Sequence, residues 1–170
     1  GIDDLEHGLF ADSEFVPNKQ PDQCPQGGAV STSLRQLDLN GAPAQETIRT
    51  LVSKNVAVTS TLRVFEAAGA PLAQSGIGAS SALLNPRMLN VMSTDARVRY
   101  LQARARVSPE TNYIALLRKA MEFERAFMKA GGLLIAGLDP TGNGGIVAGF
   151  GDLREVELLV EAGFTPVEAI

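Results

Sequence analysis

The amino-acid sequence predicts an α/β protein built on parallel strands. Two short apolar or β-branched runs, residues 56–61 (VAVTST) and 133–139 (LLIAGLD), are typical of strands. Each run directly follows a stretch with helical periodicity, and a helix that leads at once into a strand is the repeating step of a parallel α/β fold. This order, with long insertions after the strands, is expected of a barrel or of a doubly wound sheet.

The N-terminal stretch is a third candidate strand. Residues 1–8 (GIDDLEHG) end in His7-Gly8, and the glycine allows the backbone to turn sharply after the histidine. Glu6 would point to the opposite face of the strand, so the two side chains do not form an acid–base pair. A structural histidine remains the alternative for His7, since most single histidines are structural.

Residues 9–41 are predicted to be a long loop or insertion with one short helical piece near 33–39, because prolines and glycines interrupt them and no periodicity persists. They contain Cys24, the single cysteine of the chain, which excludes an internal disulfide and any cysteine-based zinc cluster. We interpret Cys24 as an unreactive bystander. The single histidine excludes a multi-histidine metal site made by this chain alone.

Amphipathic patterns predict the helices. Residues 43–54 begin with a proline in the first turn and place Ile48, Leu51 and Val52 on one face. Residues 62–109 form a second insertion, with a helical turn at 63–68, a Gly- and Ser-rich loop at 70–81 and helices at 86–91 and 95–105. We interpret the arginines of this last helix as a solvated face; they are Arg97, Arg99, Arg104 and Arg106.

The remaining helices lie in the C-terminal half. One runs from residue 108 to about 130 with an apolar stripe and ends at a Gly-Gly pair. Another covers 153–161 with Asp152 as its N-cap, and a last one opens at Thr165-Pro166. The patterns predict that residues 1 and 170 both fall inside elements, so we expect the chain to be a piece of a longer protein.

Asp139 is the candidate functional acid. It stands at the end of the predicted strand 133–139, which we expect to be buried on both faces, and it precedes a Gly-rich loop. Parallel α/β folds place their chemistry at the carboxyl ends of strands. A capping or turn aspartate is an equally weighted alternative for this position alone. His7, at the end of another predicted strand, favours a functional site.

Composition narrows the classes of partner. The formal net charge of −4 argues against binding nucleic acid through phosphate contacts, and no apolar run is long enough to cross a membrane. With 45% hydrophobic and 20% charged residues, the chain is expected to be globular and soluble. No signal peptide is visible, and the compartment stays open between the cytoplasm and a secreted or periplasmic location.

Glycines after Asp139 offer a second functional hypothesis. The run Gly142–Gly149 resembles a dinucleotide loop, whose backbone N–H groups approach phosphate, but its spacing to the next helix is too long. The chain has neither a P-loop lysine nor a G-x-S-x-G nucleophile elbow. The alternative function is therefore a non-catalytic α/β module that binds a phosphate-bearing ligand at this loop.

Four stretches together resemble the carboxyl-terminal half of an amidohydrolase-superfamily (β/α)8 barrel, closest to imidazolonepropionase-like and prolidase-like members. Leu5-Glu6-His7-Gly8 is similar to the sixth-strand motif, and residues 45–61 are similar to the helix and seventh strand that follow. Gly137-Leu138-Asp139-Pro140 resembles the eighth-strand motif, in which a threonine is common at the position of Leu138. Residues 151–170 resemble the helix after strand eight and the start of the next.

The resemblance implies one domain over residues 1–170, a partial TIM-type barrel of strands six to eight with insertions at 9–41 and 62–109. It implies a metal-dependent hydrolase of an amide or other C–N bond, in a dipeptide or cyclic amide, that uses one or two divalent ions, most often zinc. His7 and Asp139 would bind metal, and Asp139 would also act as general base and then acid. Arg63 and Thr141 would contact substrate, although a salt bridge is the alternative for Arg63.

The family's other metal ligands would precede residue 1. They are a first-strand H-x-H pair, a carboxylated lysine or its equivalent and a fifth-strand histidine. We therefore expect the isolated chain to need the missing barrel half, to be inactive and to dissolve poorly, and measurable hydrolysis by it would contradict this. Homo-oligomers are compatible with these expectations, and a purely structural barrel piece is a third hypothesis.

Overall fold

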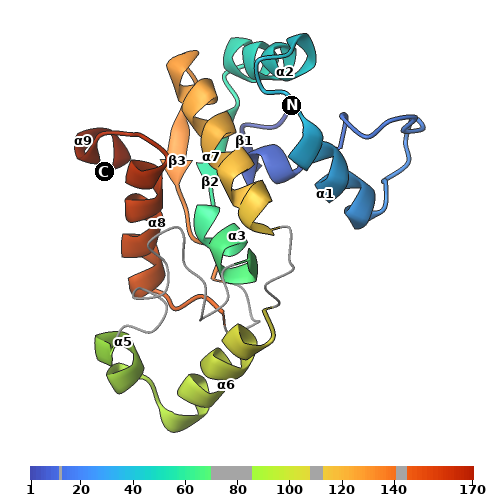
Figure 1. The fold of residues 1–170 in the computed structure, drawn as a ribbon. Helices are drawn as coiled ribbons and strands as arrows, with labels where there is room; N and C mark the ends of the chain where they lie inside the picture. Colours follow the sequence, from blue (N-terminus) through green and yellow to red (C-terminus); the bar gives the residue numbers. More distant parts are fainter. Residues whose placement is uncertain (12, 70–85, 108–112, 141–144) are drawn as a thin grey trace.

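The computed structural model shows helices packed on a three-stranded parallel sheet (Figure 1). It describes residues 1–11, 13–69, 86–107, 113–140 and 145–170. Strands β1 (Asp4–Glu6), β2 (Ala57–Ser60) and β3 (Leu134–Ala136) lie in the order β1-β2-β3. In register, Leu5 lies opposite Val58, and Val58 opposite Leu134. The α/β prediction and all three predicted strands are confirmed.

The helices of the described residues follow the predicted pattern in most places. They are the 3-10 helix η1 (Gly8–Ala11), α1 (Gly27–Gln36), α2 (Ala42–Ser53), α3 (Leu62–Gly69), α5 (Pro86–Val91), α6 (Thr94–Ala105), α7 (Tyr113–Lys129), α8 (Phe150–Glu161) and α9 (Pro166–Ala169). The loop predicted at 70–81 lies outside the described residues. None of the described helices is long and apolar enough to cross a membrane.

Two local predictions are wrong. The helical piece near 33–39 is in fact α1, which begins at Gly27 and ends at Gln36. Its two opening glycines hide the helix start in the sequence, because glycine is a poor helix former. Asp152 is not the N-cap of α8: Gly149 holds that position, and the Asp152 carboxylate accepts the Gly149 N–H at 2.6 Å from inside the first turn.

The core lies between the sheet and one layer of helices. Leu5, Val58 and Leu134 belong to the cluster that contains the buried apolar residues of α2, α7 and α8; these include Ile48, Leu117, Phe123, Phe127 and Leu158. The helix that crosses the sheet in Figure 1 is α7, which also contacts α3, α1 and η1. The largest apolar side chains are therefore buried on a single face of the sheet.

The opposite face of the sheet is open along its two edge strands, while Ala57 of the central strand is 6% exposed. Asp4, Glu6 and Ile135 are exposed, and Leu133, just before β3, is 65% exposed. The prediction that the third strand is buried on both faces is therefore wrong. The reason is that the short apolar run is covered by helices on one side only within the described residues.

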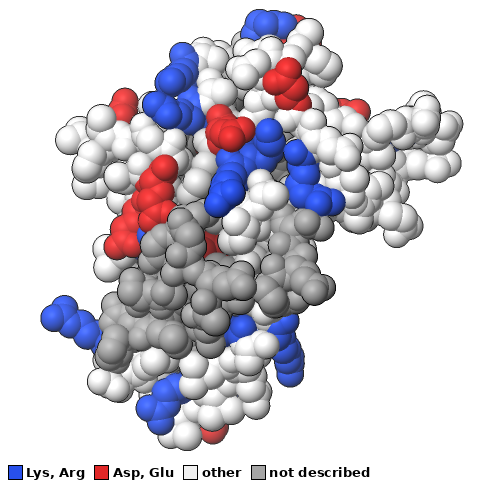
Figure 2. All heavy atoms as spheres, viewed as in Figure 1, with Lys and Arg blue, Asp and Glu red and all other residues white. Residues whose placement is uncertain are grey.

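Charges are mixed on the surface. In the view of Figure 2, acidic and basic side chains are interspersed, which agrees with the small net charge of −4. Arg97, Arg99 and Arg106 of the 94–106 segment are exposed as expected. Arg104 is only 1% exposed and donates a hydrogen bond to the Ala67 carbonyl oxygen, so its assignment to the solvated face was wrong.

Candidate functional site

Polar side chains meet at the carboxyl edge of the sheet. His7 directly follows β1, Thr61 directly follows β2, and Asp139 comes shortly after β3. His7 Nε2 lies 3.5 Å from Asp139 Oδ2, and His7 Nδ1 lies 2.8 Å from Thr61 Oγ1. The side chains of His7 and Asp139 are 36% and 33% exposed, whereas Thr61 is buried. The pair is thus open to solvent on one side and held by a hydroxyl group on the other.

Left-handed backbone positions both candidate ligands. The φ angles are 65° at His7, 48° at Gly8 and 45° at Asp139. Histidine and aspartate enter this region more readily than most residues do, and glycine enters it freely. The turn at His7 leads at once into η1, whose first hydrogen bond runs from Phe10 N to His7 O at 3.1 Å. The chain therefore turns away as soon as the strand ends and leaves the imidazole at the sheet edge.

The geometry of the pair fits two ligands of one divalent ion. Tetrahedral zinc with bonds of about 2.0–2.2 Å separates its nitrogen and oxygen ligands by about 3.4 Å. If Nδ1 donates to Thr61, the lone pair of Nε2 faces the Asp139 carboxylate, and this arrangement favours a cation between them. If Nε2 carries the proton instead, its N–H points at the Asp139 carboxylate, and the contact is ionic only when both ring nitrogens are protonated. Within the described ranges no group of three or more metal-ligating side chains occurs.

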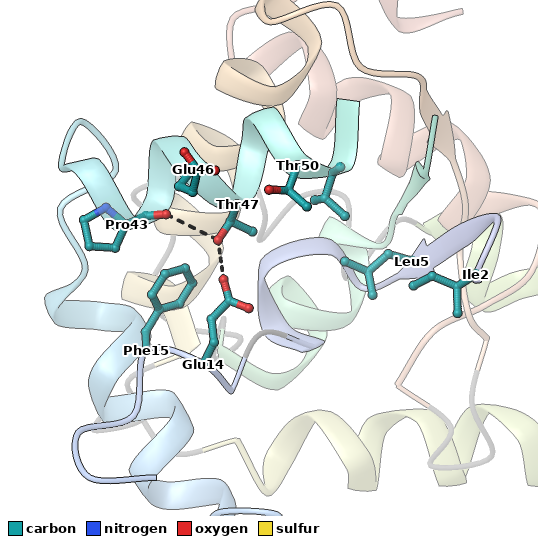
Figure 3. A pocket seen from close by; sticks show the side chains of 9 residues that line it. Ile2, Leu5, Glu14, Phe15, Pro43, Glu46, Thr47 and Thr50 are labelled. Atoms are coloured by element: carbon teal, nitrogen blue, oxygen red, sulfur yellow. Dashed lines mark hydrogen bonds between the residues drawn. The ribbon is translucent and has the colours of Figure 1, made fainter. Parts of the chain in front are cut away.

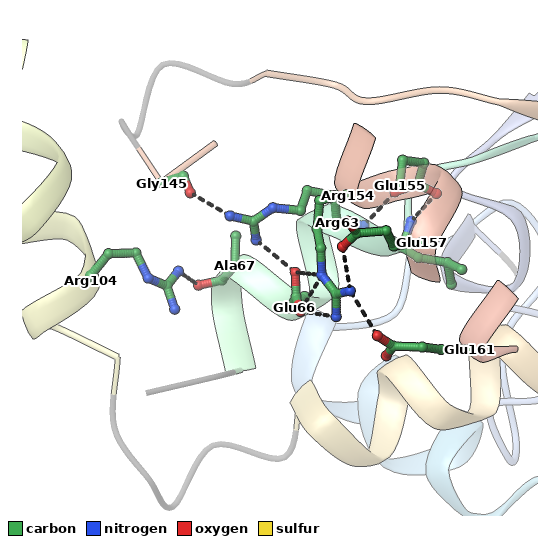
Figure 4. Close-up of polar contacts among 10 residues, drawn as sticks. Arg63, Glu66, Ala67, Arg104, Gly145, Arg154, Glu155, Glu157 and Glu161 are labelled. Atoms are coloured by element: carbon green, nitrogen blue, oxygen red, sulfur yellow. Dashed lines mark hydrogen bonds and ion pairs between the residues drawn. The ribbon is translucent and has the colours of Figure 1, made fainter. Parts of the chain in front are cut away.

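Of the two predicted substrate contacts, Arg63 is described by the structure and Thr141 is not. Arg63 is only 4% exposed, and its Nη1 lies 3.2 Å from Glu66 Oε2 as an ion pair without hydrogen-bond geometry. Its Nη2 donates to the Gly145 carbonyl oxygen at 3.4 Å (Figure 4). The salt-bridge alternative for Arg63 is what the structure shows, and its guanidinium is not open to a substrate. Thr141 lies outside the described residues.

A buried ionic cluster ties α3 to α8. Glu66 is fully buried and accepts hydrogen bonds from Arg154 Nε at 3.1 Å and Nη2 at 2.9 Å (Figure 4). Arg154 also contacts Glu157 at 3.0 Å and Glu161 at 2.7 Å. Burial lowers the pKa of Arg154, but the hydrogen bonds to these glutamates outweigh it and hold the pKa above its usual value. The cluster is a structural feature that sequence spacing did not reveal.

Two buried glutamates lie behind the sheet edge. Glu124 of α7 and Glu155 of α8 are each 1% exposed, and both contact the hydroxyl of Ser60. Burial raises the pKa of Glu124 to about 8. Repulsion from Glu155 also raises this pKa, whereas the hydrogen bond from Ser60 lowers it. Burial also raises the pKa of Glu155, against hydrogen bonds from Ser60 and backbone N–H groups. One signal was available: Glu124 interrupts the apolar stripe of α7.

At the end of the proposed phosphate-binding loop, the N-terminus of α8 is already occupied by a carboxylate of the chain. The Asp152 carboxylate accepts the N–H of Gly149, the N-cap residue of α8. Its negative charge would repel a phosphate group at this helix N-terminus. The positions 142–144 of the proposed loop lie outside the described residues. No contact in the described residues favours this alternative.

An apolar groove lies away from the sheet edge. It measures about 500 Å³ and is lined by the apolar side chains of Ile2, Leu5, Phe15, Pro43 and Leu51 (Figure 3). At its rim the Thr47 hydroxyl donates to the Glu14 carboxylate and lies 3.3 Å from the Pro43 carbonyl oxygen. Neither His7 nor Asp139 lines it, so the groove is distinct from the candidate site.

Comparisons with known protein families, with curated proteins and with solved structures found no match to this chain. The amidohydrolase resemblance therefore remains an expectation from the motifs. Fold geometry and side-chain contacts support the proposals that follow.

Proposed function

We propose that this chain is part of a metal-dependent hydrolase that acts on an amide or other C–N bond, with His7 and Asp139 as two of its metal ligands. The observation that carries the proposal is the 3.5 Å separation of His7 Nε2 and Asp139 Oδ2 at the carboxyl edge of a parallel sheet. Thr61 supports it, because a metal-binding histidine usually donates its other ring N–H to a neighbouring oxygen.

The sheet topology favours an arc of a (β/α)8 barrel. A doubly wound sheet reverses its strand order and carries helices on both faces, whereas a barrel keeps chain order and carries helices on the outside only. Here the order is β1-β2-β3, and the core lies on one face while Asp4, Glu6 and Ile135 are exposed on the other. In this proposal the strands are the sixth to eighth, the open face is the barrel interior, and the remaining strands supply the other ligands.

The described residues have separate roles in the proposed reaction. A bound divalent ion would lower the pKa of a water molecule so that hydroxide forms near neutral pH. Asp139, one third exposed, would accept the proton of the attacking water and deliver it to the leaving nitrogen. His7 would hold its ring orientation through Thr61.

Metal content tests the proposal directly. Elemental analysis of the complete gene product should find a stoichiometric divalent metal in the wild type and lose it in His7→Asn and in Asp139→Asn. Asparagine tolerates the left-handed backbone of both positions, so these variants remove the ligand without straining the turn. Glu6→Gln, which changes an exposed acid next to His7, is the matched control and should retain the metal.

A wild-type protein free of metal, with an intact fold, would contradict the hydrolase proposal and leave His7 and Asp139 as a structural side-chain contact. If the metal is present, dipeptides and cyclic amides are the substrates to screen first. Hydrolysis that disappears in Asp139→Asn and persists in Glu6→Gln would then assign the activity to this edge of the sheet.

A further inference from the structure

Three polar side chains lie buried behind the candidate site: Ser60 at the end of β2, Glu124 of α7 and Glu155 of α8. We propose that Glu124 is a neutral carboxylic acid in the folded protein at neutral pH and that it positions the end of β2, and with it Thr61 and His7. The protonation of Glu124 is independent of the hydrolase proposal. Only the functional consequence of positioning His7, as a metal ligand, rests on that proposal.

A count of protons supports the neutral acid. Ser60 Oγ lies 2.8 Å from Glu124 Oε2 and 2.7 Å from Glu155 Oε1. A serine hydroxyl has one proton and donates to only one of them. With two ionised carboxylates, the other contact would bring two acceptor oxygens together in a buried site. A proton on one glutamate resolves the conflict, because that acid donates to Ser60 and Ser60 donates onward.

The surroundings place that proton on Glu124. Glu155 also accepts the backbone N–H groups of Leu62 at 2.9 Å and of Arg63 at 2.7 Å, which open helix α3. These donors and the positive end of the helix dipole stabilise a charge on Glu155. Among the described residues, Ser60 alone hydrogen-bonds to Glu124. The chain of donation therefore runs from Glu124 to Ser60 to Glu155.

The hydrogen bonds among Glu124, Ser60 and Glu155 lie next to the two segments that position His7, the end of β2 and the turn at Gly8. Ser60 precedes Thr61, whose hydroxyl contacts His7 Nδ1, and Glu155 fixes the two residues after Thr61. On the other side, a Cβ atom at Gly8 would lie 3.8 Å from Glu124 Oε1, so Glu124 reaches the turn that follows His7. Thr61 and His7 thus both rest on segments that Glu124 contacts.

The groups that face Glu124 set its response to pH. They are Glu155 from α8, Ser60 from β2 and Gly8 from the turn after β1, with Arg63 of α3 acting through Glu155. Only Glu155 among them carries charge close to Glu124, and it repels a second negative charge. Ionisation of Glu124 would therefore place two negative charges, those of Glu124 and Glu155, beside Ser60 at the end of β2.

Infrared spectroscopy tests the protonation. The difference spectrum between the wild type and Glu124→Gln at pH 7 should show the C=O stretch of a protonated carboxylic acid, which gives way to a carboxylate band around pH 8. The amide of glutamine still donates to Ser60, so the network stays connected in the variant. Glu122→Gln, an exposed glutamate on the same helix, is the control and should show no such band. A carboxylate band for Glu124 at pH 7 would overturn the proposal.

The pH dependence of folding gives a second test. The folded-state pKa of Glu124, about 8, is above the ordinary value of 4.5, so the folded protein keeps a proton that the unfolded chain releases. The stability from this group is fully present below pH 4.5 and is lost as the pH rises through 8, by at most tenfold in the folding constant per pH unit. Glu124→Gln should lose this contribution and Glu122→Gln should keep it; equal pH slopes would overturn the proposal.

The imidazole of His7 reports on positioning. In the complete gene product with a chelator present, the ¹⁵N resonances of His7, identified by their loss in His7→Asn, should show an inflection near pH 8 in the wild type and none in Glu124→Gln. Resonances that stay flat through pH 8 in the wild type would overturn the positioning role. If Glu124→Gln does not fold, the wild-type infrared titration still decides the protonation. A metal-free wild type would contradict the hydrolase proposal only.

Discussion

Glu66 offers the sharpest test of how helix α3 is held against α8. Its carboxylate is fully buried, accepts two hydrogen bonds from Arg154 and lies 3.2 Å from Arg63 Nη1. Glu66→Ala would leave two buried guanidinium groups without this partner. Removing one member of a buried ion pair typically costs about 3–5 kcal/mol. Because Arg154 keeps Glu157 and Glu161, we expect the lower end, about 3 kcal/mol.

The chain contains a matched exposed pair. Glu46 and Arg49 have the same spacing of three residues in a helix and a short contact of 2.6 Å, but their side chains are 68% and 62% exposed. Exposed pairs of this kind contribute about 0.2–1 kcal/mol, since water screens them. Urea unfolding should therefore move the midpoint strongly for Glu66→Ala and barely for Glu46→Ala. If the two variants lost the same free energy of unfolding, the stabilising role assigned to the buried cluster would be refuted.

Two further substitutions test the core and the candidate site. A Cβ atom at Gly132 would lie 2.3 Å from Phe127 Cζ, so Gly132→Ala should lower the free energy of unfolding by about 1–3 kcal/mol in thermal melts. Gly28→Ala in α1 meets nothing within 4 Å and should be neutral or stabilising by up to about 1 kcal/mol; equal losses would contradict the packing at Phe127. Thr61→Val keeps the shape of a buried side chain but removes the hydroxyl on His7 Nδ1, so metal affinity in a competition titration should fall about 10–100-fold. Unchanged affinity would show that Thr61 does not orient His7.

The sequence predicted the parts of the fold that depend on local pattern. β-branched and apolar runs located the strands, and amphipathic spacing located α2, α5, α6 and α8 to within a few residues. His7 and Asp139 were selected because each follows a predicted strand, and the structure brings their side chains to 3.5 Å of each other. Parallel strands present their carboxyl ends at one edge of the sheet, so residues that follow different strands become neighbours there.

Burial was harder to predict, because it depends on distant segments. Arg104 was assigned to a solvated face, yet it donates to the Ala67 carbonyl oxygen of α3. Arg63 lies beside Glu66 of α3 and donates to the Gly145 carbonyl oxygen, which is a neighbour only in the folded chain. The open face at Ile135 was missed for the converse reason, since an apolar run does not reveal how many layers cover it. The burial of Glu124 was also missed, although a charged residue inside an apolar helical stripe is a local signal of a buried polar contact.

The pairing of the strands also determines when the candidate site is assembled. Asp4 pairs with Ala57, and Val58 pairs with Leu134, so each contact closes a long loop of chain. Pairings of this kind form late and slowly, because the entropy of loop closure must be overcome before they contribute. His7, Thr61 and Asp139 each follow a different strand, so none of the three strand segments brings them together by itself. In the proposed metal site, metal capture by His7 and Asp139 would therefore serve as a kinetic marker for the pairing of these strands, and a ligand that binds only the paired strands would stabilise that pairing.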